Sequence, residues 1–262
     1  ETYNISPEKI AKAVTKKTKA IMPVDLYGLP ADTQPIREIA KEHELTIIED
    51  AAQAHGASYK GKPPGSFADV ACWSFYASKN MTTGEGGMMT TNNSDLAEKA
   101  RFMRSHGEKT KYRSVMFGHN YHMPEIQAAI GCVQLKKLPR LVAKRRENAK
   151  RLTRILRKED RLQLPIEPKD REHSWYLYTV RLKGAREKER DKIVEELRRK
   201  GIEAGVIYMN PVHLMPYYRS LGKYRLPETE KAAKQVFSLP VHPGVTSQQI
   251  DFIGETVLHL LK

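Results

Sequence analysis

The chain has 262 residues, 40% of them hydrophobic, and a formal net charge of +14 at pH 7. These values suit one large or two modest folded domains and exclude a largely disordered chain. No run of about 18 apolar residues occurs, so we expect no membrane-spanning helix, and we expect no secretory signal either. The two cysteines, Cys72 and Cys132, lack metal-ligand spacing. We therefore expect reduced thiols, no metal site and a cytoplasmic location.

The first half of the chain alternates between predicted helices and strands, which is typical of an α/β fold with a mostly parallel sheet and helices on both faces. Pro7, with Ser6 as N-cap, is expected to start the first helix. The other elements expected in this half are a strand at 19–24, a helix at 32–43, a strand at 45–48, strands at 70–75 and 88–91, and a helix from its cap Ser94 to about 104.

The second half follows a different pattern. Two helices are expected between about residues 124 and 157, broken at Pro139. The later elements expected are a strand at 174–182, a helix at 187–200, a strand at 203–207 and a helix at about 247–261. The sequence thus predicts most of a large domain at 1–138 and, at 139–262, a connecting helix with a smaller α+β domain.

Much of the positive charge falls on the predicted helix at 140–158, where apolar residues recur among the lysines and arginines. This pattern favours a solvated helix with an apolar stripe over a nucleic-acid site. No recognition-helix signature or aromatic-rich ribbon accompanies it. An anionic small molecule remains compatible with the charge.

Three short segments contain residues suited to catalysis: Glu49 to Gly56 after one strand, Ser74 to Lys79 after another, and the glycine-rich 84–87. Each is ambiguous alone. An aspartate after a strand is usually a cap or turn former, a loop lysine is usually a surface charge, and glycines often only form a turn. The glycines also lack the spacing of a dinucleotide-binding fingerprint.

Together, Asp50 and Lys79 suggest pyridoxal phosphate chemistry. A lysine that forms a Schiff base must lie beside an aldehyde in a site that lets it lose its proton. The cofactor ring works as an electron sink only while its nitrogen stays protonated, which a buried carboxylate ensures. Both residues follow predicted strands, and the carboxyl ends of parallel strands share one edge of a sheet.

The motifs resemble the DegT/DnrJ/EryC1/StrS family of pyridoxal-phosphate-dependent sugar aminotransferases of fold type I. The resemblance is carried by the acidic segment 49–56, Ser-Phe-Tyr-Ala-Ser-Lys-Asn at 74–80, Thr-Gly-Glu-Gly-Gly at 83–87, Gly-His-Asn-Tyr-His-Met at 118–123, and Ser-Leu-Pro-Val-His-Pro at 238–243. It covers almost the whole chain. It implies amino transfer from glutamate (or glutamine) to a keto sugar, in most relatives nucleotide-linked.

The resemblance also implies residue roles. Lys79 would carry the internal aldimine and move protons, and Asp50 would pair with the pyridinium nitrogen. Gln53 would approach the ring and its phenolic oxygen, and Ser74 would bind the cofactor phosphate. Asn120 would reach the phosphate in a partner's site, which implies a homodimer. For Ser74 a plain strand role and for Asn120 a plain turn role remain open.

One family feature is missing from the match. The resemblance implies an N-terminal segment, with a phosphate-binding turn and an aromatic residue that stacks on the ring, and neither is found before Asp50. The alternatives are an inactive or regulatory fragment of the family, or a basic nucleic-acid-binding regulator. A dehydratase of the same fold is disfavoured because such relatives replace the lysine that Lys79 matches.

Overall fold

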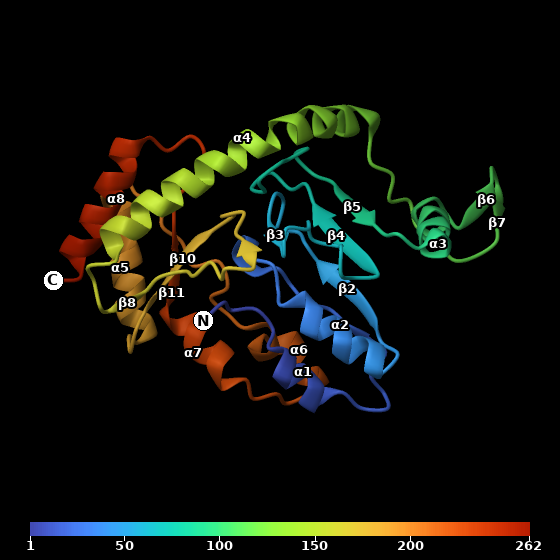
Figure 1. The fold of residues 1–262 in the computed structure, drawn as a ribbon, viewed down its shortest axis with the longest axis horizontal. Coiled ribbons are helices and arrows are strands. Elements are labelled where there is room, and N and C mark those ends of the chain that lie inside the picture. The colour runs from blue at the N-terminus through green and yellow to red at the C-terminus, as the bar shows by residue number, and fades with distance from the viewer. The chain divides into compact units, whose positions relative to one another are not determined.

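The computed structural model describes residues 1–262, which divide into two compact units (Figure 1). The larger unit comprises residues 2–142 and 167–176, and the smaller one residues 143–166 and 177–262, with Glu1. The segment 167–176 thus returns to the larger unit after the chain has already left it. None of the helices combines the length and the apolar character that crossing a membrane requires.

The larger unit is built on a four-stranded sheet of order β1-β2-β4-β5. Its strands are β1 (Ala20–Ile21), β2 (Thr46–Asp50), β4 (Val70–Ser74) and β5 (Gly87–Thr90). β1, β2 and β4 are parallel, and β5 runs antiparallel to β4. The α/β fold and the mostly parallel sheet are therefore confirmed, and β2 extends through Glu49 and Asp50.

Two short helices, α1 (Pro7–Ala13) and α2 (Thr33–Glu42), cover one face of this sheet. Ser6 accepts a hydrogen bond from the Lys9 amide and Pro7 occupies the first turn, as predicted. The core that joins helices and strands consists of Ile10, Ile21, Ala31, Ile36, Ala40 and Ile47. Since Ile47 points to the helices, alternation along β2 turns Ile48 and Asp50 to the opposite face.

The rest of the larger unit contains α3 (Ser94–Arg104), the first half of α4 (Glu125–Leu156), and the short pairs β3 (Ser58–Tyr59) with β9 (Arg171–Glu172) and β6 (Glu108–Thr110) with β7 (Arg113–Ser114). The expected Ser94 cap is wrong by one residue, because the Asn93 side chain accepts from the amides of Asp95 and Leu96. A 3-10 turn, η1 (Leu26–Gly28), follows β1.

The expected break at Pro139 is also wrong. α4 runs through Pro139 as one helix, which Figure 1 shows as continuous. Proline removes one hydrogen bond, to the carbonyl four residues earlier, here that of Leu135. Leu135 is exposed, so water can satisfy that carbonyl, and the flanking residues are good helix formers.

The smaller unit has a three-stranded antiparallel sheet of order β11-β10-β8, with β8 (Leu162–Gln163), β10 (Tyr178–Leu182) and β11 (Val236–Leu239). Its other elements are the second half of α4, α5 (Glu187–Arg199), η2 (Val212–Leu214), α6 (Pro216–Leu221), α7 (Pro227–Gln235) and α8 (Ser247–Leu260). β10 begins four residues later than expected. The strand expected at 203–207 is replaced by a single bridge between Gly205 and Ser238.

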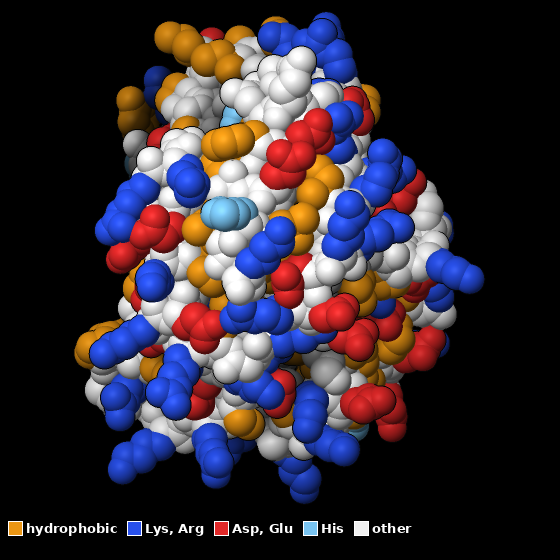
Figure 2. Space-filling view, turned by 90° about the vertical axis from the view of Figure 1, so that its left-hand side faces the viewer, with side chains coloured by type: hydrophobic (Ala, Val, Ile, Leu, Met, Phe, Trp, Pro, Cys, Tyr) orange, Lys and Arg blue, Asp and Glu red, His pale blue; other side chains and the backbone are white.

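The positive charge is distributed rather than gathered on the face drawn in Figure 2. Lysine and arginine side chains there alternate with aspartate and glutamate side chains. Arg151 on α4 illustrates this, because both Asp251 carboxylate oxygens accept its hydrogen bonds at 2.6 Å. The interspersed acids on this face do not favour a nucleic-acid site there.

Candidate functional site

Asp50 and Ser74 lie on the same face of two neighbouring strands. The parallel register of β2 and β4 places Asp50 opposite Cys72, and Ser74 follows two residues later. Residues in register share a face, as do residues two apart along a strand. The Cys72 thiol lies near the Asp50 carboxylate: burial, and after it the charge of Asp50, raises the pKa of the thiol. The face is half-buried at all three residues, so a ligand can approach it.

Lys79 lies in the closed loop that follows β4. The loop is fastened at its base, where the Phe75 carbonyl accepts from the Thr83 amide at 2.9 Å and from the Thr82 hydroxyl at 3.0 Å. The Lys79 amide bonds the Tyr76 carbonyl inside the loop. The Lys79 ammonium nitrogen lies 4.7 Å from the centroid of the Tyr176 ring, and its side chain is half-buried.

Asn80 and Ser174 anchor this loop to the rest of the unit. The buried Asn80 amide donates to the carbonyls of Ser174 (3.0 Å) and His55 (3.3 Å). The buried Ser174 hydroxyl lies within hydrogen-bond distance of the carbonyls of Gly28 and Gln53. Through these bonds, one returning segment contacts the Lys79 loop, the turn after β1 and the turn after β2.

Gln53 is buried and its side-chain oxygen accepts a hydrogen bond of 2.7 Å from the Tyr27 amide. Tyr27 and Gly28 both have positive φ, 62° and 102°. Two features require a glycine at position 28. Its positive φ disfavours other residues, and a Cβ there would collide with the Ser174 hydroxyl. The position of Gln53 therefore depends on this tight turn.

The structure brings Asp50, Gln53, Ser74 and Lys79 into one unit on connected turns and strand ends. Asn120 lies elsewhere in that unit, between β7 and α4, where it is exposed and forms a bridge with Ser105. The Ser74 hydroxyl accepts a hydrogen bond from the Tyr76 amide at 3.3 Å, and this bond does not use the hydroxyl proton.

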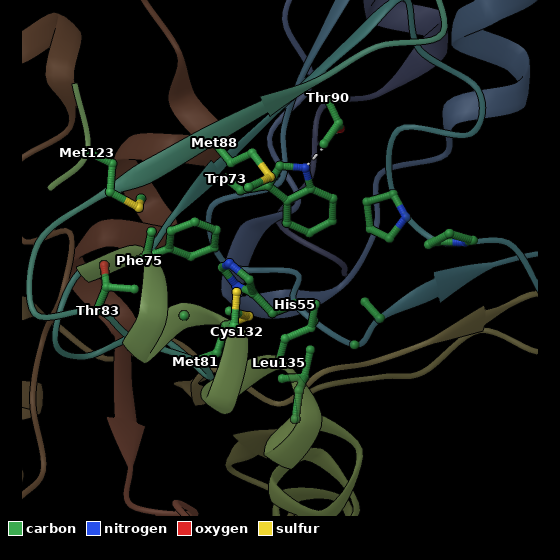
Figure 3. A pocket seen from close by; sticks show the side chains of 17 residues that line it. His55, Trp73, Phe75, Met81, Thr83, Met88, Thr90, Met123, Cys132 and Leu135 are labelled. Carbon is green, nitrogen blue, oxygen red and sulfur yellow. Dashed lines mark hydrogen bonds between the residues drawn. The ribbon is translucent and has the colours of Figure 1, made fainter. Parts of the chain in front are cut away.

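The opposite face of β4 lines an apolar cavity of about 500 Å³. Figure 3 shows its wall, in which Trp73, Phe75 and His55 face Cys132 and Leu135 of α4. Trp73 and Ser74 are successive strand residues and point to opposite faces, so this cavity is not where a phosphate beside Ser74 would bind. Burial and the charge of Lys79 lower the pKa of His55 to about 4. The imidazole is therefore neutral at pH 7.

The roles of Tyr176, Ser174 and Asn80 were not visible in the sequence. The strand expected at 174–182 includes Ser174 and Tyr176, whereas both precede β10. The run from His173 to Tyr176 could have argued against a strand there, because its residues do not alternate between apolar and polar. His173 and Trp175 stack there at 4.1 Å, and Trp175 has a positive φ of 53°.

The comparisons with known proteins show the family of this chain. The model of the DegT/DnrJ/EryC1/StrS aminotransferase family matches residues 1–258. A pleiotropic regulatory protein of Geobacillus stearothermophilus is 43% identical over 98% of this chain and 69% of its own length. GDP-perosamine synthase of Caulobacter vibrioides is 40% identical over 95% of this chain and 68% of its own length.

Solved structures show the same relationship. DesV of S. venezuelae, solved with a ketimine intermediate, matches with a TM-score of 0.94 and 36% identity over 99% of this chain and 69% of its own. A Streptococcus pneumoniae sugar aminotransferase, solved in its PLP form, matches with a TM-score of 0.90 and 28% identity over 100% of this chain and 73% of its own. The chain belongs to the DegT/DnrJ/EryC1/StrS aminotransferase family.

Proposed function

We propose that this chain transfers an amino group from glutamate (or glutamine) to the keto carbon of a nucleotide-linked sugar. Its cofactor is pyridoxal 5′-phosphate, in keeping with the family and with the PLP and PMP forms of the S. pneumoniae relative. The names of two relatives support the sugar class: GDP-perosamine synthase and a dTDP-amino-sugar transaminase of Streptomyces venezuelae, 38% identical. When bound, the cofactor supplies an aldehyde and a protonated ring that withdraws electrons.

The observation that carries the residue assignment is the shared face of Asp50 and Ser74, with the Lys79 loop directly after β4. Asp50 would hold the proton on the ring nitrogen, because its half-buried carboxylate stabilises that positive charge. The Ser74 hydroxyl would donate to the phosphate. These three residues supply the amine, carboxylate and hydroxyl that the cofactor requires, so they fit it.

Lys79 would form the covalent link through its Nζ and later move the proton at the reacting carbon. The Tyr176 ring would hold that nitrogen in place until cofactor arrives. Gln53 would donate from its amide nitrogen to the phenolic oxygen, since its carbonyl oxygen already accepts from Tyr27.

Asn120 would serve a second copy of the chain. Support comes from its surroundings, because Phe117 and Tyr121 are exposed to 76% and 69% and flank it. His119 stacks on Tyr121 at 4.5 Å, so the segment forms a ridge of exposed rings. Exposed apolar patches mark interaction sites, which fits a homodimer interface.

The free thiols of Cys72 and Cys132, the second of them exposed, fit a cytoplasmic location.

The test is covalent attachment of the cofactor to Lys79. The purified chain is mixed with pyridoxal 5′-phosphate, its absorbance spectrum is recorded, and borohydride is added before peptide mapping. The wild type should yield a labelled peptide containing Lys79, and Lys79→Ala should yield none. Lys62→Ala, at an exposed loop lysine, is the matched control and should label normally. A folded wild type that takes up no label would refute the assignment.

A further inference from the structure

Two acidic side chains are buried together behind Asp50. Asp25 is 0% exposed and Glu49 is 2% exposed, and neither belongs to the residues assigned above. Val24, shortly after β1, forms an isolated bridge with Asp50 of β2, so Asp25 and Glu49 both point to the face opposite Asp50. Burial, and after it the neighbouring charge of Glu49, raises the pKa of Asp25 well above its usual range. Burial also raises the pKa of Glu49.

Each carboxyl group has one backbone partner. Asp25 Oδ1 accepts from the Ala31 amide at 2.9 Å, and Glu49 Oε2 accepts from the Gly65 amide. The second Asp25 oxygen, Oδ2, is buried without a donor. Asp25 and Glu49 point to the same face of adjacent segments, since Val24 forms a bridge with Asp50 and the Asp25 amide donates to the Asp50 carbonyl. Two carboxylates cannot form a hydrogen bond with each other, because neither has a donor, but a carboxylic acid can donate one to a carboxylate. A buried acceptor without a donor lowers the stability of the fold.

We propose that Asp25 keeps its proton at neutral pH, donates it from Oδ2 to Glu49, and so positions the turn that holds Gln53. Two adjacent buried anions would repel in a medium of low dielectric constant, whereas the singly protonated pair carries one charge and satisfies both acids. Asp25 and Glu49 thus form a carboxyl–carboxylate pair that shares one proton. Asp25 and Glu49 are positioning residues, since they contact the cofactor site only through other groups.

The connection to the site runs through the backbone. Asp25 begins the turn whose residue Tyr27 donates to Gln53, and the amide of Asp25 donates to the carbonyl of Asp50 at 3.0 Å. Glu49 is the residue before Asp50 in β2. The charged groups that act on Asp25 are Glu49 and Asp50, both from β2. Loss of the shared proton should therefore disturb Gln53 and the Asp50 carboxyl together.

The first experiment detects the proton directly in the cofactor-free chain. The infrared difference spectrum between wild type and Asp25→Asn at pH 7 should contain the C=O stretch of a protonated carboxyl group. Asp69→Asn is the matched control, because Asp69 is an exposed carboxylate whose Oδ2 bonds the Ile47 amide of the same strand. Its difference spectrum should show carboxylate bands alone. Carboxylate bands alone for Asp25→Asn would overturn the proposal.

The second experiment measures pH dependence. The raised pKa of Asp25 means that the contribution of Asp25 to stability is lost as pH rises from the unfolded pKa through the folded one. In urea unfolding from about pH 4 to about pH 9, the stability of wild type relative to Asp25→Asn should therefore fall as pH rises, whereas its stability relative to Asp69→Asn should not. Glu49→Gln, which removes the neighbouring charge, should move the fall to lower pH. An unchanged profile in both site variants would overturn the proposal.

The third experiment separates positioning from mere stability. Hydrogen exchange at the Tyr27 amide should stay slow in Asp25→Asn, whose amide can donate to Glu49, and become at least about tenfold faster in Asp25→Ala. Equal rates in the two variants would refute the positioning role. The effect on Asp50 and Gln53 as cofactor ligands rests on the proposed function. Because all three readouts use the cofactor-free chain, their failure is distinguishable from a failure of cofactor binding.

Discussion

The ammonium nitrogen of Lys79 lies over the ring of Tyr176, 4.7 Å from its centroid. The phenol oxygen of Tyr176 lies 3.0 Å from the Ser78 hydroxyl, so the ring is fixed from the same loop that carries the lysine. Lys79 and Tyr176 are far apart in sequence. The Lys79 amine is therefore positioned by a side chain that only the fold brings to it.

Tyr176→Leu should slow amino transfer. A cation–π contact stabilises by roughly 0.5–1 kcal/mol at partly exposed sites, so kcat/KM should fall about twofold to fivefold. Tyr176→Phe keeps the ring and loses only the bond to Ser78, so its effect should be smaller. The check is the steady-state rate with glutamate and a nucleotide-linked keto sugar. Equal losses in both variants would contradict a role for the ring itself.

Gln53→Met should destabilise the larger unit before any cofactor is considered. The substitution removes the acceptor for the Tyr27 amide and leaves that N–H buried, which costs about 1–3 kcal/mol. Urea unfolding at pH 7 measures the change in free energy. Gln248→Met, at an exposed position, serves as control and should change stability by less than about 0.5 kcal/mol. Similar effects at both positions would show that the buried bond is unimportant.

Asn148→Leu should destabilise the smaller unit. The Asn148 amide is 1% exposed and lies within hydrogen-bond distance of the carbonyls of Val241, His242 and Val245. Leucine has a similar volume but no donor, so buried carbonyls lose their partner at a cost of about 1–3 kcal/mol. Thermal unfolding should report it as a lowered Tm. The exposed Asn92→Leu variant should melt close to wild type.

His55 should make stability fall in acid. Its pKa is lowered from 6.5 in the unfolded chain to about 4 in the fold, so the unfolded state binds the proton first as pH drops. The stabilisation is complete above pH 6.5 and lost as pH falls through about 4, by about 3 kcal/mol in total. His55→Phe fits the rings of Trp73 and Phe75 around it and should flatten this part of the profile. An identical acid limb in both proteins would contradict the prediction.

Local patterns predicted much of the α/β unit correctly. Apolar spacing and caps located α1 and α2, and short apolar runs located β2 and β4, because these signals depend on neighbours in sequence. The same patterns failed at Pro139, where one missing N–H was not enough to end α4. They also failed at 203–207, where a single bridge between Gly205 and Ser238 forms instead of a strand.

The sequence by itself determined the family, because Asp50, Lys79 and the residues around them form motifs that are read without a fold. It also indicated that Asp50 and Lys79 follow neighbouring strands. Only the tertiary structure decided the partners of these residues. Tyr176 reaches Lys79, Ser174 bonds the turns at Gly28 and Gln53, and Asp25 is buried on the same face as Glu49. These contacts join distant segments, and burial, which changes the pKa of a carboxyl group, exists only once those segments have packed.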